Sequence, residues 1–217
     1  MALRKKFTGQ LHQLHEELAA MGALIQSAIA NAVQILKGGD MSLLEESMKY
    51  EEEINMLEKD IENLCLKIMW QQHPIASDLR LVSATLKIIT DMERIGDNAL
   101  DIADTAKHFY GKEIQFDSDI IIKMAKESIK MVEDSVTSFI NMDVETAREV
   151  VLYDDVVDDL FDEFMVKSAE NFEKKRTSIT SQMELLMIAK YFEKIADHAV
   201  SIAEWAEFAV TGEHERH

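Results

Sequence analysis

Acidic side chains at one-turn spacing are the clearest chemical feature of this sequence. One row steps by four, four and three residues and consists of Glu93, Asp97, Asp101 and Asp104. A second row has the same spacing one hundred residues later and consists of Glu193, Asp197, Ser201 and Glu204. On α-helices each row would lie along one face, where like charges one turn apart are destabilising. An ordinary solvated face would alternate its charges, so the rows indicate a bound cation or a basic partner surface.

Two further pairs of oxygen-bearing side chains precede these rows: Glu51 with Asn55, and Asp154 with Asp158. If the helix of each pair packs on the helix of a row, either the pKa values rise or a cation fills the gap. Mg²⁺, Mn²⁺, Ca²⁺ and iron suit such ligands. The predicted metal ligands are Glu93, Asp97, Glu193, Asp197, Asp154, Asp158, Glu51 and Asn55. Acidic runs are also common as solvated helix surface, and that alternative stays open.

Histidine and cysteine offer weaker candidates. His12, His15 and Glu16 have ligand-like spacing, but they are more simply a polar flank of the first helix. His198 follows Asp197 and points about 100° away around a helix. At best it would hydrogen-bond to a metal ligand without binding the metal itself. Cys65 is the only cysteine and lies between two leucines, which excludes an internal disulfide.

Motifs for several kinds of catalysis are missing from the sequence. No Glu-x-x-His pattern of di-iron bundles occurs, nor HExxH, a nucleotide-binding glycine loop or GxSxG. We therefore expect a protein that is not an enzyme, with no catalytic residue.

Composition narrows the class further. The 217 residues include one Pro and seven Gly, too few for the turns of an all-β fold. The formal net charge of -18 argues against nucleic-acid binding and favours cations or basic partners. No apolar run reaches the length of a membrane span, and no leader opens the chain, so we expect a soluble, cytoplasmic protein.

Sparse helix breakers divide the chain into six helical segments. The breakers lie at Gly38 and Gly39, at Pro74, and near residues 110–111, 141–143 and 175–181. The expected helices are 7–37, 42–72, 75–109, 118–141, 144–174 and 179–210. Predicted N-terminal caps are Ser42 with Glu45, Asp143, and Ser181 with Glu184. The third helix carries two apolar seams and should be the inner helix of a bundle.

An internal duplication organises these helices. A shift of 100 residues places the third segment on the sixth, and a shift of 103 places the second on the fifth. The predicted fold is therefore all-α, with two tandem three-helix bundles at 1–110 and 111–217. Residues 1–108 carry 17 acids and 11 bases, and the rest carry 24 and 12, so the second half is the more acidic.

Three stretches resemble the PhoU family of accessory regulators of bacterial phosphate transport. They are HPIASDLR at 73–80, MERIGDNA at 92–99 and FEKIADHA at 192–199. The resemblance extends over nearly the whole chain. It implies two three-helix bundles, a homodimer, and E/DxxxD motifs that hold iron, zinc or Mg/Mn-type ions. Glu93, Asp97, Glu193 and Asp197 match the motif positions, whereas Asn55, Asn98 and Lys194 depart from the family pattern.

The resemblance also implies a function and partners. Such proteins are negative regulators of phosphate uptake and starvation signalling. They act between the ATPase of the phosphate ABC transporter and a phosphate-sensing histidine kinase, and reach the membrane only through these partners. Three alternatives stay open: a helical scaffold without metal, a regulator of another transporter, and a metal-dependent hydrolase.

Overall fold

Six long α-helices make up the protein. A computed structural model describes residues 2–110, 118–173 and 178–213, and within them it contains no strand. The helices are α1 (Ala2–Leu36), α2 (Ser42–Gln72), α3 (Ser77–Ala106), α4 (Ser118–Asn141), α5 (Val144–Glu173) and α6 (Ile179–Thr211), with a 3₁₀ turn η1 (Lys107–Phe109) after α3. The all-α prediction is confirmed.

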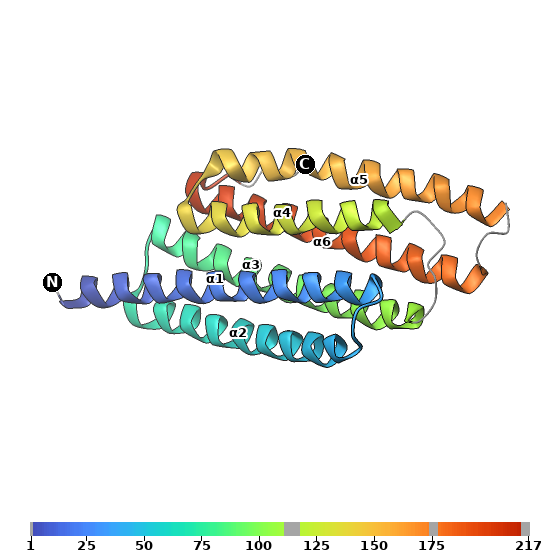
Figure 1. The fold of residues 1–217 in the computed structure, drawn as a ribbon. Coiled ribbons are helices and arrows are strands. Elements are labelled where there is room, and N and C mark those ends of the chain that lie inside the picture. Colours follow the sequence, from blue (N-terminus) through green and yellow to red (C-terminus); the bar gives the residue numbers. More distant parts are fainter. Residues whose placement is uncertain (1, 111–117, 174–177, 214–217) are drawn as a thin grey trace.

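The helices form two three-helix bundles that lie against each other (Figure 1). Helices α1, α2 and α3 make the first bundle, and α4, α5 and α6 make the second. The bundles meet through α3 with α6, the most extensive helix pair, and through α1 with α4. The third helix is thus an inner helix, as its two apolar seams predicted. The expected boundary after residue 110 adjoins residues 111–117, which lie outside the described part of the chain.

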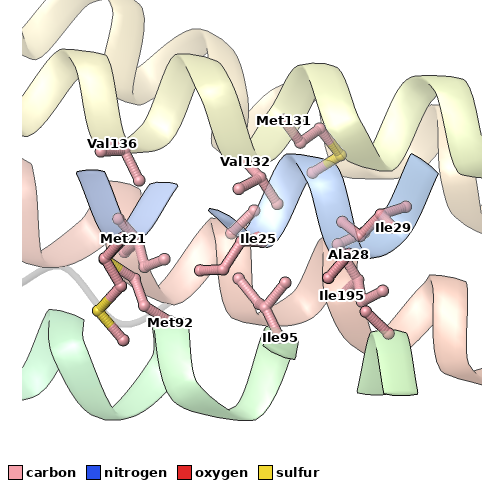
Figure 2. Close-up of a cluster of buried hydrophobic side chains, with 14 of the residues drawn as sticks. Met21, Ile25, Ala28, Ile29, Met92, Ile95, Met131, Val132, Val136 and Ile195 are labelled. Carbon is pink, nitrogen blue, oxygen red and sulfur yellow. The ribbon is translucent and has the colours of Figure 1, made fainter. Parts of the chain in front are cut away.

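One apolar core joins the two bundles (Figure 2). Met21, Ile25 and Ile29 of α1 lie beside Val132 of α4 and Ile95 of α3. All five side chains are fully buried. At Gly22 α1 lies close to α4, since a Cβ there would be in ordinary van der Waals contact with Val136 at 3.6 Å. The two repeats therefore share one interior.

Helix α1 is the one described helix that is long and apolar enough to cross a membrane by length and composition, over Lys6–Leu36. In the fold its apolar seam is covered by protein. Leu14, Leu18 and Ile25 are fully buried against the other helices. The apolar character of α1 is thus accounted for by its place in the core.

Two of the three predicted caps are wrong. Helix α2 begins at Ser42, whose N–H donates to Asp40 Oδ1 at 3.1 Å, so Ser42 lies inside the first turn. Ser178 caps α6 and accepts from the Ser181 N–H at 3.1 Å. In both cases a polar side chain two or three positions before the predicted cap accepts a hydrogen bond from a first-turn N–H group.

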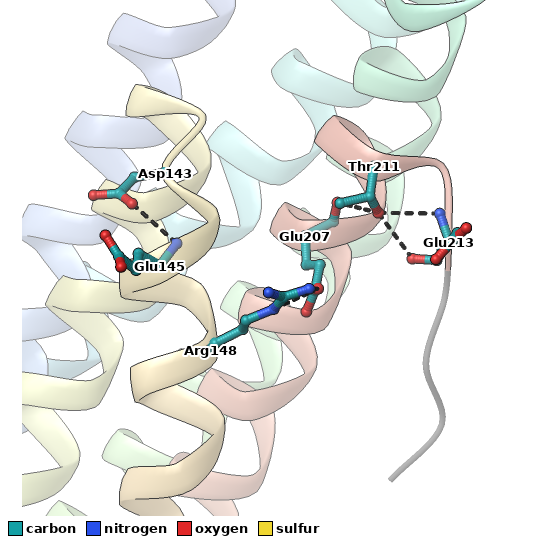
Figure 3. A network of polar contacts seen from close by, with 6 residues as sticks. All are labelled: Asp143, Glu145, Arg148, Glu207, Thr211 and Glu213. Carbon is teal, nitrogen blue, oxygen red and sulfur yellow. Dashed lines mark hydrogen bonds and ion pairs between the residues drawn. The ribbon is translucent and has the colours of Figure 1, made fainter.

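The cap at Asp143 is confirmed, and it fixes the start of α5 (Figure 3). Asp143 Oδ1 accepts from the N–H group of Glu145 at 3.1 Å, as Figure 3 shows. It also accepts from the N–H group of Thr146 at 3.2 Å. One turn later, Arg148 forms an ion pair with Glu207 of α6 at 2.5 Å. These contacts tie the start of α5 to the last turns of α6.

Close contact between α2 and α3 depends on Gly96, which lies between the predicted ligands Glu93 and Asp97. A Cβ at Gly96 would meet Ile54 Cδ1 at 3.0 Å and Cγ2 at 3.2 Å. The second repeat has Ala196 and Val157 at the corresponding positions. The larger residue on one helix is thus matched by a smaller one on the other.

This compensation gives a stability test. Gly96→Ala should lower the free energy of unfolding by about 1–2 kcal/mol, because buried Ile54 has little room to move. Adding Ile54→Val recreates the pair of the second repeat and should recover most of that loss. Urea denaturation monitored by circular dichroism measures both. A double variant no more stable than Gly96→Ala would contradict the matched packing.

Candidate metal centres

The structure brings the second predicted set of ligands together between α5 and α6. The two helices run antiparallel and pack along their length, and Gln182 of α6 donates to Ser168 Oγ of α5. Further along, Lys190 Nζ lies 5.3 Å from the centre of the Phe161 ring. This pairing places the α5 acids beside the α6 acids. We call the set the second cluster: Asp154, Asp158, Glu193 and Asp197.

Asp154 is the most perturbed carboxyl of this cluster. Burial, followed by the charges of Asp158, Asp197 and Glu193, raises its pKa to about 6. Its Oδ1 is buried and makes no hydrogen bond. Burial and the charges of Glu193 and Asp197 also raise the pKa of Asp158. The second cluster therefore holds unneutralised negative charge in a partly dehydrated place.

Two lysines of α6 neutralise part of that charge. Lys190 Nζ lies 2.5 Å from Glu193 Oε1, and Lys194 Nζ lies 2.5 Å from Asp197 Oδ2. The hydrogen bond to Asp197 raises the pKa of Lys194. Lys194 is also 3.5 Å from Glu193 Oε2, which is buried and has no hydrogen-bond partner. The ion pairs thus neutralise part of the charge of the α6 acids and include no cation for Asp154.

The first cluster lies between α2 and α3. We define it as Glu51, Asn55, Glu58, Glu93 and Asp97. Burial and then the charges of Asp97 and Glu58 raise the pKa of Glu93. Burial and then Glu51 raise the pKa of Asp97. Asn55 donates to Glu51 Oε1 at 2.5 Å, which leaves Asn55 Oδ1 buried without a partner.

Glu58 is a member of the first cluster that sequence reasoning missed. It lies seven residues after Glu51 and three after Asn55, so it continues the same face of α2. Burial and Glu62 raise its pKa, with a smaller contribution from Asp97. The second repeat has Phe161 at this position, so the duplication gave no signal for it.

The two remaining acids of the first row have other partners. Asp101 interacts with Tyr191 of α6 by a hydrogen bond that lowers its pKa, although burial raises that pKa more. Asp104 pairs with Lys107. In each row, therefore, the first two acids face the neighbouring helix of the same repeat. Glu51, Asn55 and the six acids predicted as ligands all lie in one of the two clusters.

His198 faces the other bundle, away from the second cluster. Its Nδ1 lies 2.9 Å from Asp91 Oδ1 of α3, and Ser201 donates to Asp91 Oδ2 at 2.7 Å. Asp91 is only 8% exposed. The expectation that His198 supports a metal ligand is thus not met, because α3 packs against that side of α6.

His12 and His15 lie on α1, apart from both clusters. His12 is exposed and lies 3.6 Å from Glu16. Burial, and then His12, lowers the pKa of His15. This arrangement agrees with the polar flank expected for α1.

Both clusters offer oxygen donors suited to a hard cation. Within the described residues, no three His, Cys, Asp or Glu side chains already stand in a metal-holding arrangement. An ion would therefore require carboxylates to rotate towards it. The unpartnered oxygens of Asn55 in the first cluster, and of Asp154 and Glu193 in the second, are available for this. The donor sets fit an ion such as Mg²⁺, Mn²⁺ or iron.

Comparisons with known proteins agree on one family. The PhoU domain model matches residues 18–106 and 121–206, once in each bundle. A phosphate-specific transport system accessory protein PhoU homolog of Clostridium acetobutylicum is 30% identical over 210 residues, covering 96% of each chain. The homolog of Aquifex aeolicus is 34% identical over 190 residues, covering 87% of this chain and 86% of its own.

Solved structures agree with this result. The crystal structure of PhoU from Pseudomonas aeruginosa superposes with a TM-score of 0.90 at 28% identity, covering 95% of this chain and 100% of that one. The phosphate transport system regulatory protein PhoU from Streptococcus pneumoniae gives 0.86 at 26% identity, covering 97% and 99%.

The raised pKa of Asp154 predicts how stability depends on pH. A carboxyl whose pKa is higher in the folded state stabilises the protein at low pH, and this contribution is lost as the pH rises through about 6. Asp154→Asn stays uncharged and should make the metal-free protein more stable at pH 7, by about 1 kcal/mol after allowance for solvent screening. The difference should vanish below about pH 4.

Urea denaturation at a series of pH values, in the presence of chelator, measures this effect. The matched control is Asp60→Asn, which removes an exposed carboxylate of α2. The control should change stability by less than about 0.5 kcal/mol at every pH. A loss of stability in Asp154→Asn at pH 7 would contradict the repulsion described here.

Proposed function

The chain belongs to the PhoU family, and from this premise we propose that it is a non-enzymatic, metal-binding adaptor that regulates phosphate transport. Its curated relatives are named accessory proteins of the phosphate-specific transport system. The proposal is that this chain restrains phosphate uptake and the starvation response when phosphate is plentiful. Its proposed partners are the ATPase of the phosphate ABC transporter and a phosphate-sensing histidine kinase.

The observation that carries the metal-binding part is the unneutralised carboxylate cluster in each repeat. Like charges gathered on two packed helices raise one another's pKa values, and Asn55, Asp154 and Glu193 each leave a buried oxygen without a hydrogen bond. A divalent cation would supply the missing positive charge and satisfy these oxygens. Iron, zinc and Mg/Mn-type ions are the candidates.

The chain's own residues suit a reversible adaptor. Without an ion, Lys190 and Lys194 pair with Glu193 and Asp197. On ion binding, these lysines would turn outward, and the surface around the second cluster would change its charge pattern. A partner that recognises either pattern is then thermodynamically linked to the metal.

Localisation and assembly follow from the same proposal. A regulator that contacts an ATPase and a kinase domain acts in the cytoplasm and reaches the membrane only through those partners. The proposed assembly is a homodimer. The formal net charge of -18 supports basic protein surfaces as partners and opposes nucleic acid.

A metal-free scaffold is the second candidate. The ion pairs of Lys190 and Lys194 favour it, since internal cations already satisfy half of the second cluster. The two candidates differ in one property, which is whether carboxylate variants change the metal content.

Metal content therefore tests the proposal. Glu93→Ala combined with Glu193→Ala should remove most bound metal, measured by elemental analysis of protein equilibrated with Mn²⁺ or Fe²⁺, and should leave the helical circular dichroism unchanged. In the parent protein, metal should also raise the melting temperature, because an ion that binds only the folded state stabilises it. The variant should lose this rise.

The matched control is Glu52→Ala with Asp155→Ala. These residues occupy corresponding exposed positions on α2 and α5, next to the clusters but on the outer faces. The control should keep its metal. Equal metal content in all three proteins would favour the scaffold.

The partner assignment is tested by affinity capture from phosphate-replete cells. Tagged full-length protein should retain the transporter ATPase, the histidine kinase or both, identified by mass spectrometry. Recovery of the ATPase of a different transporter would reassign the system it regulates.

A further inference from the structure

The surface between α5 and α6 continues past the second cluster as an apolar strip. On α5 one face steps by three and four residues through Asp154, Asp158, Phe161, Met165, Ser168 and Phe172. On α6 the adjoining face carries Ile179, Met183, Met187, Lys190, Lys194 and Asp197. The Gln182–Ser168 hydrogen bond and the Lys190–Phe161 contact set the two faces side by side. One end of this surface is acidic and the other is apolar.

We define the apolar strip as Met165, Phe172, Ile179, Met183 and Met187. Their exposed fractions are 40, 52, 62, 63 and 47%, which is high for large apolar side chains. Ile179, Met183 and Met187 are one turn apart on α6 and form one continuous ridge. Scattered exposed apolar residues need no explanation, but a contiguous set marks an interaction site.

The first repeat shows that the fold does not require this strip. The corresponding positions of that repeat are occupied by Glu62, Met69, Leu79, Ser83 and Lys87. Three of the five are polar or charged there, although the helices pack in the same way. The apolar character is therefore specific to the second repeat.

Charge and shape indicate what the strip binds. Helix α5 carries ten acidic residues and two basic ones, and Asp158 and Asp162 lie beside the strip. Methionine side chains adapt to different apolar partners, and a ridge of residues four apart matches the apolar face of a helix. Anionic lipid would be repelled by this surface, whereas lysines and arginines would be attracted.

We propose that the apolar strip and the acidic residues beside it dock an amphipathic helix of a partner protein, with lysine or arginine flanking its apolar face. This inference deepens the adaptor role proposed above. The five residues of the apolar strip lie outside the second cluster, and of the two acids beside the strip only Asp158 belongs to that cluster, so the apolar contacts need no metal. Each apolar side chain of the partner helix would contact the ridge, and its basic residues would reach Asp158 and Asp162.

A synthetic peptide tests the proposal. The probe is a fluorescein-labelled amphipathic helix of about 18 leucine and lysine residues, long enough to cover the strip and the acids. Fluorescence anisotropy measures its binding to the full chain in chelator. Met183→Ser combined with Met187→Lys copies the first repeat and should weaken binding by about tenfold or more. Met165→Glu, on the opposite wall, should weaken it similarly through the lost apolar contact.

Two controls make the outcome decisive. Met56→Lys changes an exposed methionine of α2, which is 64% exposed, and should bind as the parent does. A peptide with glutamate in place of lysine should bind much more weakly. Equal loss in Met56→Lys, or equal binding of the glutamate peptide, would overturn the proposal.

Membrane binding is the competing outcome. The probe is a vesicle of phosphatidylcholine and phosphatidylserine. If such vesicles bind the parent, Met183→Ser with Met165→Glu shows whether the strip is responsible. Loss of vesicle binding in this variant with unchanged peptide binding would mean that the strip is a lipid surface and that the proposal is wrong. Peptide binding that persists in chelator and in Glu93→Ala with Glu193→Ala separates this inference from the metal-binding proposal. If metal binding fails and peptide binding succeeds, the docking role stands alone.

Discussion

Mutual repulsion between carboxylates on tightly packed helices is the constraint on which the two candidate metal sites depend. Helix α2 must approach α3, and α5 must approach α6, to bury the cores of the two bundles. Gly96 and Ala196 at the contact allow that approach, and they lie between the acidic residues of each row. The same packing that stabilises each bundle therefore forces its carboxylates together. Burial then raises the pKa values of Glu93, Asp97 and Asp154.

The two repeats resolve this repulsion differently. The second cluster has lysine ion pairs on α6, whereas in the first cluster Asn55 replaces an acid and donates to Glu51. Removing one acid and adding a cation are alternative ways to reduce negative charge. Each still leaves a buried oxygen without a partner. The duplication thus preserved the arrangement of helices while the charge balance of the two clusters diverged.

Much of the fold follows from the sequence because helix periodicity and scarce breakers are strong local patterns. The duplication also located both clusters, since a spacing that recurs in register is a more specific pattern than one acidic run. The features that could not be predicted from the sequence depend on contacts between side chains that no helix pattern specifies. The cap positions shifted to Asp40 and Ser178, where an earlier side chain reached the free N–H groups. His198 turned to Asp91 because of packing between the bundles, which no single-helix pattern contains.

The continuous apolar core links the two clusters and the apolar strip through α3 and α6. Because α3 and α6 are inner helices of a continuous core, they carry acids of both clusters and also form the main contact between bundles. Asp91 with Ser201, and Asp101 with Tyr191, bind the same two helices at related positions of the duplication. A side-chain rearrangement on α6 would therefore also change its contacts with α3. An ion in one cluster, or a partner helix on the strip beside it, would therefore act on a body that includes both repeats, as the proposed adaptor role requires.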